Sequence, residues 1–274
     1  MPVAEEVISQ PADIQRVKTL AQGLQSGLRM NIGLYLGASA LGALERWQET
    51  SAHNIAASSN PGFRKSEVEF SMNGAGAIPS GAASGNATQA AQFPSSRVSV
   101  SFVPGQFVGT GRELDVAIRG EGFFEVQTAD GNRAYTRSGS FYTNSERTLV
   151  DAQGNSVLGE GGAPIQLLQE GGSLAIAGDG TLSQGGRAIG KLTIQRFDNL
   201  QALVPLSGGL FSANGQPPQP VENPSLMQGS LETSNVQPVE EMVNLIQISR
   251  AYEAAQKVIT SRDDTLDKTI KTFS

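Results

Sequence analysis

The chain has 274 residues and a mass of 28.7 kDa, enough for one large or two modest domains. Charged residues make up 17% and aromatic residues 6%, whereas glycine (32) and proline (13) are plentiful, which predicts many short strands joined by turns. The net charge of −6 argues against non-specific binding to nucleic acid. With no cysteine and one histidine, His53, the sequence excludes disulfide scaffolds, cysteine nucleophiles and histidine-built metal clusters.

No segment of the sequence is long and apolar enough to cross a bilayer. The most apolar stretch, residues 31–44, is short and is interrupted by glycines, and charged residues follow it directly. No cationic run precedes this stretch and no small-residue cleavage site follows it promptly, so we do not expect a cleaved signal peptide. The sequence therefore predicts no integral membrane span. It predicts a cytosolic protein or one exported without a cleaved signal.

Residues 1–29 carry as many acidic as basic side chains and include glycines that weaken a helix. We expect them to be an extension ahead of an internal start at Met30. The next segment, 30–65, is predicted to hold a helix over residues 31–58. Its seam advances in steps of four and three and includes Leu34, Leu41 and Ile55. An Asn-Pro-Gly sequence at residues 60–62 ends this helix.

Residues 66–96 are predicted to be a flexible segment, because glycine, alanine and serine dominate from residue 71 onward and charges are scarce. A β body is predicted over residues 97–235. Alternation of apolar and polar residues begins at residues 98–102, and glycine-rich turns separate the later strand-like pieces, which favours an all-β body over βαβ units. These pieces are residues 114–118, 122–127, 133–137, 140–143, 173–177, 191–197 and 225–233.

Residues 236–274 are predicted to form a long helix, because no proline or glycine follows Pro238. Two interleaved heptad rows are typical of a coiled-coil seam. One row contains Leu245, Tyr252, Ile259 and Leu266, and the other contains Ile248 and Ala255. About 36 helical residues would extend roughly 54 Å, beyond a β body of this size. Either the two terminal helices form a simple hairpin docked on that body, or they pack against other copies and neighbours.

No constellation of side chains predicts catalysis, metal binding or cofactor binding. His53 is expected to face solvent or to bond a backbone carbonyl. The adjacent pairs Glu240-Glu241 and Asp263-Asp264 project about 100° apart on a helix, so we assign both pairs to solvated faces. The Gly-Glu-Gly at residues 120–122 lacks the third glycine of a dinucleotide-binding motif. We therefore predict that the protein is not an enzyme and has no catalytic residues, cofactors or bound metal.

Three sequence blocks resemble the signature motifs of the bacterial flagellar rod and hook proteins. The first is HNIAASSNPGFRK at residues 53–65. The second is LDVAIRGEGFFEV at 114–126 followed by YTRSGSF at 135–141. The third is GSLETSNV at 229–236, followed by the helical motif at 240–253. The positions that match the family motif are Asn54, Gly62, Phe63, Leu114, Asp115, Gly122, Phe123, Tyr135, Arg137, Gly139, Ser234 and Asn235.

The departures from the family pattern concern the subtype. His53 and Ala57 stand where the family has asparagine, and Arg147 stands at a usual glycine. The length of the chain and its brief β body favour the proximal-rod type, with the distal-rod type next.

The resemblance implies an α+β fold in which a mainly-β body is flanked by terminal helices that pair as a coiled coil. It implies a structural axial subunit of the flagellar basal-body rod, which polymerises through these helices into the driveshaft that transmits torque to the hook. The implied partners are copies of the chain, other rod and hook axial proteins and the flagellar type III export apparatus, without nucleic acid. The implied location is the periplasmic rod, reached without a cleaved signal peptide.

An alternative function is that of a secreted β-rich binding or adhesion protein with an oligomerising coiled-coil tail. Such a protein would need a ligand groove with exposed aromatic side chains. The sequence has a single tryptophan, Trp47, which lies on a predicted helix, and only four tyrosines. This composition weakens the alternative.

Overall fold

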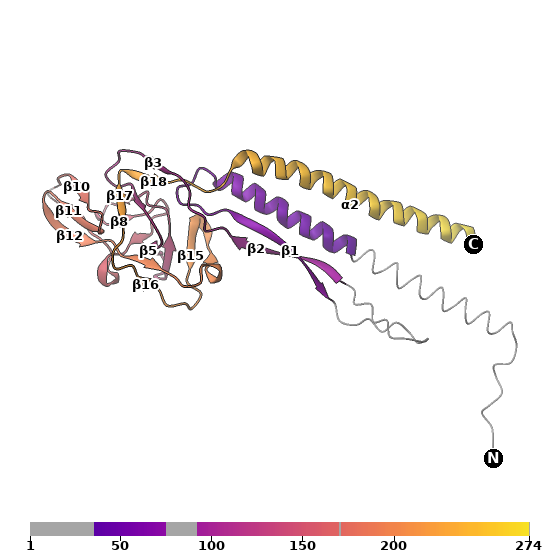
Figure 1. The fold of residues 1–274 in the computed structure, drawn as a ribbon, viewed down its shortest axis with the longest axis horizontal. Coiled ribbons are helices and arrows are strands. Elements are labelled where there is room, and N and C mark those ends of the chain that lie inside the picture. The colour runs from indigo at the N-terminus through magenta and orange to yellow at the C-terminus, as the bar shows by residue number, and fades with distance from the viewer. Residues whose placement is uncertain (1–35, 75–91, 170, 274) are drawn as a thin grey trace, which may run out of the picture. The chain divides into compact units, whose positions relative to one another are not determined.

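The computed structural model describes residues 36–74, 92–169 and 171–273. It shows a mainly-β chain with a helix toward each end (Figure 1), which confirms the predicted α+β class. The chain divides into two compact units. The first comprises residues 1–48, 68–97 and 246–274, and the second comprises residues 49–67 and 98–245. The predicted extension 1–29 and the seam residue Leu34 lie outside the described residues.

Helical residues of both ends meet in the first unit. The N-terminal helix is described over residues 36–57, and α2 covers Pro238–Phe273, so both predicted helices are present. A Cβ atom built on Gly37 would lie 3.1 Å from Cγ1 of Ile259. The two helices therefore touch at a residue that has no side chain of its own, where backbones can approach closely.

The first unit also contains most of a two-stranded sheet made of β1 (Ser66–Gly74) and β2 (Gln92–Val100). Trp47 packs edge-to-face on Phe70 of β1, with ring centroids 5.6 Å apart. The sequence predicted a flexible segment over 66–96, whereas residues 66–74 and 92–96 are strand. Pairing with each other and cover from an aromatic side chain stabilise these residues despite their low apolar content. Residues 75–91 lie outside the described part of the chain.

The second unit is built around a nine-stranded sheet in which all pairings are antiparallel. Its main path runs β14 (Val204–Pro205), β15 (Leu210–Ser212), β6 (Arg133–Thr136), β5 (Phe123–Gln127), β9 (Ser156–Val157), β8 (Leu149–Val150) and β7 (Tyr142–Thr143). β13 (Ile194–Arg196) pairs with both β5 and β16 (Gln219–Pro220). Strands this short agree with the glycine-rich turns of the sequence.

Three smaller antiparallel sheets complete this unit. One joins β10 (Leu174–Ile176), β11 (Thr181–Gln184) and β12 (Arg187–Lys191). The others pair β17 (Leu226–Gln228) with β4 (Val116–Ile118), and β18 (Ser230–Glu232) with β3 (Phe107–Gly109). Short 3-10 helices cover Glu160–Gly162, Leu200–Ala202 and Ser207–Gly209. The last strands before α2 thus pair with the first strands of the body.

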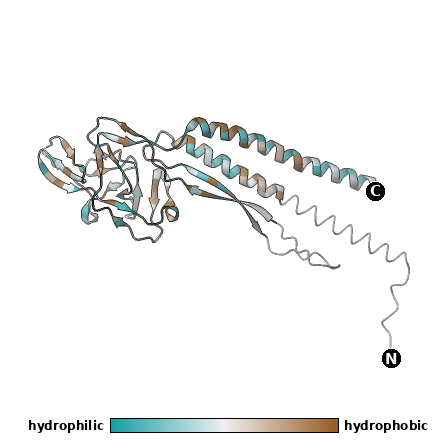
Figure 2. Cartoon of the chain, in the orientation of Figure 1, coloured by the Kyte–Doolittle hydropathy of each residue, from teal (hydrophilic) through white to brown (hydrophobic). Residues whose placement is uncertain are grey.

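The core of the second unit consists of inward-facing residues of the strands and of the segments beside them, several of them fully buried, such as Phe124, Phe141 and Leu149. A second, aromatic cluster joins Phe123, Tyr135, Phe197 and Phe211 with their neighbours. Hydrophobic and hydrophilic residues alternate along the strands and along α2 (Figure 2). Among the described residues, no helix combines the length and apolarity that a bilayer span requires.

Candidate functional site

A buried carboxylate joins three distant segments of the second unit. The side chain of Glu232 on β18 is 1% exposed. Its Oε1 atom accepts a hydrogen bond from Nη2 of Arg64 at 2.7 Å, and its Oε2 atom accepts one from Nε of Arg137 at 2.6 Å. The backbone N–H of Gly105 donates to Oε1 at 2.9 Å. We call Arg64, Arg137 and Glu232 the charged junction.

Arg137 is held from its other side by backbone carbonyls. Its Nη2 donates to the carbonyls of Ile118 at 2.8 Å and of Gly120 at 2.6 Å, and its Nη1 donates to the carbonyl of Gly122. Both glycines have φ near +120°, a conformation that side chains disfavour. The Gly-x-Gly of the motif therefore turns two carbonyls toward one guanidinium and forms no phosphate-binding loop.

The electrostatics of the junction favour its charged state. Burial alone would raise the pKa of Glu232, but the hydrogen bond and charge of Arg137, together with those of Arg64, outweigh burial and hold this pKa below its ordinary value. Burial lowers the pKa of Arg64, the charge of Glu232 opposes that shift, and Arg137 adds repulsion. Hydrogen bonds between charged groups are stronger than neutral ones, so the junction connects its three segments strongly.

A second set of contacts ties the first turn of α2 to the segment that follows the N-terminal helix. Nζ of Lys65 lies 2.8 Å from Oε1 of Glu241, whose side chain is 2% exposed. The backbone N–H of Lys65 donates to Oδ1 of Asn235 at 2.7 Å. The Nδ2 atom of Asn235 donates to the carbonyls of Ser101 and Val103 at 3.0 and 2.9 Å. One asparagine therefore bridges two chain segments just before α2 begins.

Near the end of the N-terminal helix, Asn54 also bridges two chain segments through its side-chain amide. It is 1% exposed, its Nδ2 donates to the carbonyl of Ser66 at 2.8 Å, and its Oδ1 accepts the N–H of Ser66 at 2.9 Å. Burial would raise the pKa of Glu241, but hydrogen bonds from Lys65, Ser51 and Asn54 and the charge of Lys65 together lower it. The ends of both helices that belong to the second unit are thus fixed to one polar cluster.

Two motif glycines are required by close backbone contact. Gly62 has φ +69°, and a Cβ atom there would lie 2.4 Å from the carbonyl carbon of Arg137. A Cβ atom on Gly139 would lie 1.6 Å from the carbonyl oxygen of Val116. The N–H of Gly62 donates to the carbonyl of Glu232 at 2.7 Å. The three sequence blocks therefore meet at backbone level as well as through charges.

Most of the remaining motif residues contribute apolar side chains to the hydrophobic clusters of the chain. Phe63 is buried with Ala57 and Val236, and Phe123 and Tyr135 lie in the aromatic cluster. Leu114 packs against the main core. The motif residues Asp115 and Ser234 contribute through hydrogen bonds. Asp115 accepts one from Oγ1 of Thr110 at 2.7 Å, and Oγ of Ser234 accepts one from the N–H of Val236 at 3.1 Å.

The predicted seam residues of α2 lie on its more covered face. Ile248 is fully buried, and the others that can be described are half-buried, namely Leu245, Tyr252, Ala255 and Ile259. Leu41 and Ile55 of the N-terminal helix are also half-buried. The side chain of Leu266 lies outside the described residues.

Sequence reasoning missed the role of three charged residues: Arg64, Glu232 and Glu241. The prediction that both Glu240 and Glu241 face solvent is correct for Glu240 and wrong for Glu241, because the latter pairs with Lys65. All three residues stand inside the motif blocks, which was the available signal. His53 is exposed and stacks edge-on against Phe63, with centroids 5.5 Å apart.

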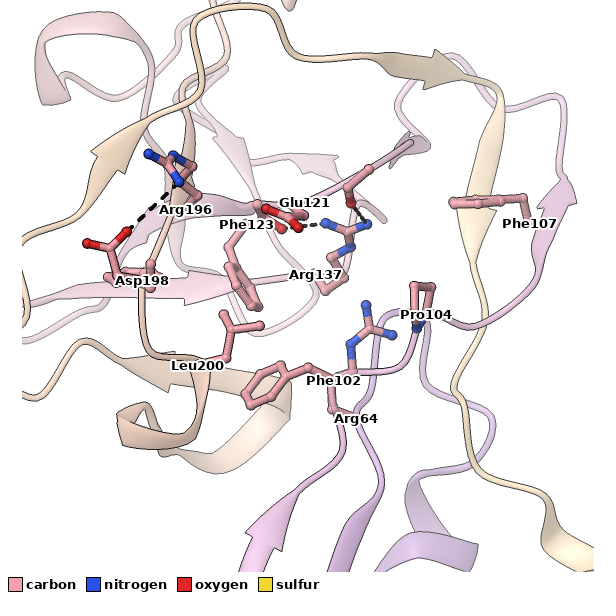
Figure 3. A pocket seen from close by; sticks show the side chains of 13 residues that line it. Arg64, Phe102, Pro104, Phe107, Glu121, Phe123, Arg137, Arg196, Asp198 and Leu200 are labelled. Carbon is pink, nitrogen blue, oxygen red and sulfur yellow. Dashed lines mark hydrogen bonds and ion pairs between the residues drawn. The ribbon is translucent and has the colours of Figure 1, made fainter.

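A pocket of about 490 Å³ opens beside the charged junction (Figure 3). Arg64 and Arg137 form part of its wall, the residues from Gly120 to Phe123 contribute one edge, and Phe102 and Phe107 add aromatic surface. Within the described parts of the chain, no three histidine, cysteine or acidic side chains gather as metal ligands would.

Comparison with known proteins finds flagellar basal-body rod proteins among the relatives of this chain. A family model described as the flagellar hook protein FlgE/F/G D1 domain matches residues 117–184, and one described as the flagellar basal body rod FlgEFG protein C-terminal matches residues 227–272. The flagellar basal-body rod protein FlgF of Caulobacter vibrioides is 36% identical over 84% of this chain and 93% of its own length. FlgF of Rhizobium meliloti is 34% identical over 89% and 98%, and the rod protein FlgG of Agrobacterium fabrum is 33% identical over 84% and 95%.

Proposed function

The chain belongs to the family of flagellar basal-body rod proteins, and we propose that it builds the rod by packing its terminal helices against those of neighbouring subunits, forming the shaft that transmits torque to the hook. The family is structural, so the chain is a structural protein of the flagellar basal body and not an enzyme. This membership favours the rod over the alternative of a secreted adhesion protein. FlgF and FlgG proteins match at similar identity, and the proximal-rod type stays a prediction.

The observation that carries the proposal is a second apolar row on α2. Opposite the half-buried seam, this helix leaves large apolar side chains exposed: Val239 (74%), Met242 (52%), Val243 (48%), Ile246 (55%) and Val258 (61%). The first four are spaced at i, i+3, i+4 and i+7, the spacing of one helix face. A helix with an occupied seam and an additional apolar face is suited to contact more than one neighbour.

The proposed seam joins the N-terminal helix to α2 as a coiled coil. The contact between Gly37 and Ile259 and the burial of Ile248 support this pairing. The exposed row then remains for neighbouring subunits, which we propose are copies of this chain and other rod and hook axial proteins. Export through the flagellar type III apparatus without a cleaved signal, and a periplasmic position of the assembled rod, complete the proposal.

Replacement of Ile246 by aspartate tests the assembly role of the exposed row. Because Ile246 is 55% exposed, I246D should leave the circular dichroism spectrum and melting temperature of the monomer unchanged. It should abolish swimming in soft agar and remove the protein from purified basal bodies, since a buried unpaired charge opposes association. The matched control is Gln247→Asp, which adds the same charge one residue away on an exposed polar position. Normal basal bodies with I246D would contradict the proposal.

A further inference from the structure

The pocket beside the charged junction contains donors that the junction does not use. The side chain of Arg64 is 3% exposed and gives its Nη2 atom to Glu232. Its Nε and Nη1 atoms are buried and have no hydrogen-bond acceptor among the described residues. Buried polar groups are normally paired, and an arginine fork can hold a second carboxylate. Arg64 therefore has capacity for an anionic group from outside the chain.

The side chains around Arg64 indicate which kind of group would bring such a carboxylate into the pocket. Phe102, Phe107, Phe123 and Leu200 give the pocket an apolar wall, and its volume of about 490 Å³ accommodates a few side chains. Figure 3 shows Arg64 next to Phe102 and Pro104, so charge and apolar surface adjoin. An acidic side chain beside an apolar one matches this combination.

We propose that this pocket receives the first turn of α2 from a second copy of the chain, with the carboxylate of Glu240 toward Arg64 and Val239 against the aromatic wall. Among the large apolar residues exposed in the described chain, Val239 is the most exposed, at 74%. Glu240 follows it, is exposed, and has no hydrogen bond or ion pair among the described residues. The inference rests on the proposed rod function for the presence of a neighbour.

Such a contact joins two different sets of residues, because none of the residues that line the pocket lies on α2. A contact of this heterologous kind closes into a ring or continues as an open helical array. The pocket therefore adds to assembly a directional contact that does not depend on the helix seam.

The absence of cysteine from the chain makes cross-linking a direct test. One variant carries Glu121→Cys at the exposed edge of the pocket, and a tagged variant carries Val239→Cys. Mixed and oxidised under conditions that promote self-association, they should form a disulfide heterodimer about tenfold more than the control mixture. The control pairs V239C with Glu146→Cys, an exposed glutamate outside the pocket lining. Adding Glu240→Gln to V239C should reduce the yield about fivefold if the carboxylate meets Arg64.

Sedimentation of the same mixtures separates this inference from the proposed function. Self-association with a heterodimer yield equal to that of the control would overturn the pocket contact and leave the rod function in place. A yield that E240Q does not change would overturn the proposed recognition of the carboxylate. Absence of both self-association and cross-link would contradict the pocket contact and also count against polymerisation of the chain.

Discussion

Replacing Glu232 by glutamine should destabilise the β body strongly, because it leaves two buried guanidinium groups without a counter-charge. Glutamine keeps the size and one acceptor of glutamate, but it brings an amide donor toward Arg64 or Arg137, where the carboxylate accepts bonds of 2.7 and 2.6 Å. Removing one partner of a buried ion pair costs roughly 3–5 kcal/mol of unfolding free energy. Since proteins are stable by only about 5–15 kcal/mol, this loss is a large fraction of the total.

The assay is scanning calorimetry of the purified full-length chain. For a body of this size, 1 kcal/mol shifts the melting temperature by about 2–4 °C, so E232Q should melt roughly 10 °C below the parent chain. The matched control is Glu125→Gln. The side chain of Glu125 is 2% exposed, but that of its ion-pair partner Arg133 is 58% exposed and returns to water when the carboxylate is lost. The glutamine oxygen can still accept the hydrogen bond that Nε2 of Gln195 donates to Glu125 at 3.1 Å. We expect this control to cost about 1 kcal/mol.

The comparison of the two variants isolates the effect of burying both partners. If E232Q melted within about 3 °C of E125Q, the charged junction would contribute no more to the free energy of unfolding than an ion pair with one exposed partner. The reasoning from buried charges would then be refuted, and the family motif would need another explanation at this position.

Three further outcomes follow from the same contacts. Because the pKa of Glu241 is lowered in the folded chain, its stabilising contribution is present above its ordinary pKa of 4.5 and is lost as the pH falls through the folded value. In urea titrations from pH 7 to 3, E241Q should therefore lose less unfolding free energy than the parent chain. Gly139→Ala should cost at least about 3 kcal/mol by steric overlap, whereas Gly131→Ala, which has open space and φ +79°, should cost about 1 kcal/mol in urea denaturation. Ile248→Ala should lower unfolding free energy by about 2–5 kcal/mol and speed proteolysis of α2, whereas Val258→Ala, 61% exposed, should change neither.

The helices could be predicted from the sequence because their signal is local. The heptad rows after Pro238 depend on spacing within one segment, and α2 begins at that residue. The more covered face of α2 also follows from the heptad, as the burial of Ile248 shows. Glycine-rich turns similarly indicated the short strands of the body.

The charged junction could not be predicted in the same way, since its pairs join residues far apart in the chain. Glu241 has the local pattern of a solvated acidic pair, and its burial depends on Lys65 from the opposite end of the sequence. The strand residues 66–74 and 92–96, which lie in the segment predicted to be flexible, were missed for a related reason. Their composition is poor in apolar residues, and their stability comes from pairing and from cover by Trp47, which composition does not encode.

The separation of Arg64 and Glu232 along the chain also bears on the order of folding. These residues are 168 positions apart, and β18 pairs with β3 across almost the whole β body. Contacts of such long range form slowly, because a large loop must close before they contribute. When the chain becomes available for folding from its N-terminus onward, the junction can form only after residue 232 is also available. Arg64 therefore stays without Glu232 until nearly the entire β body is free to fold.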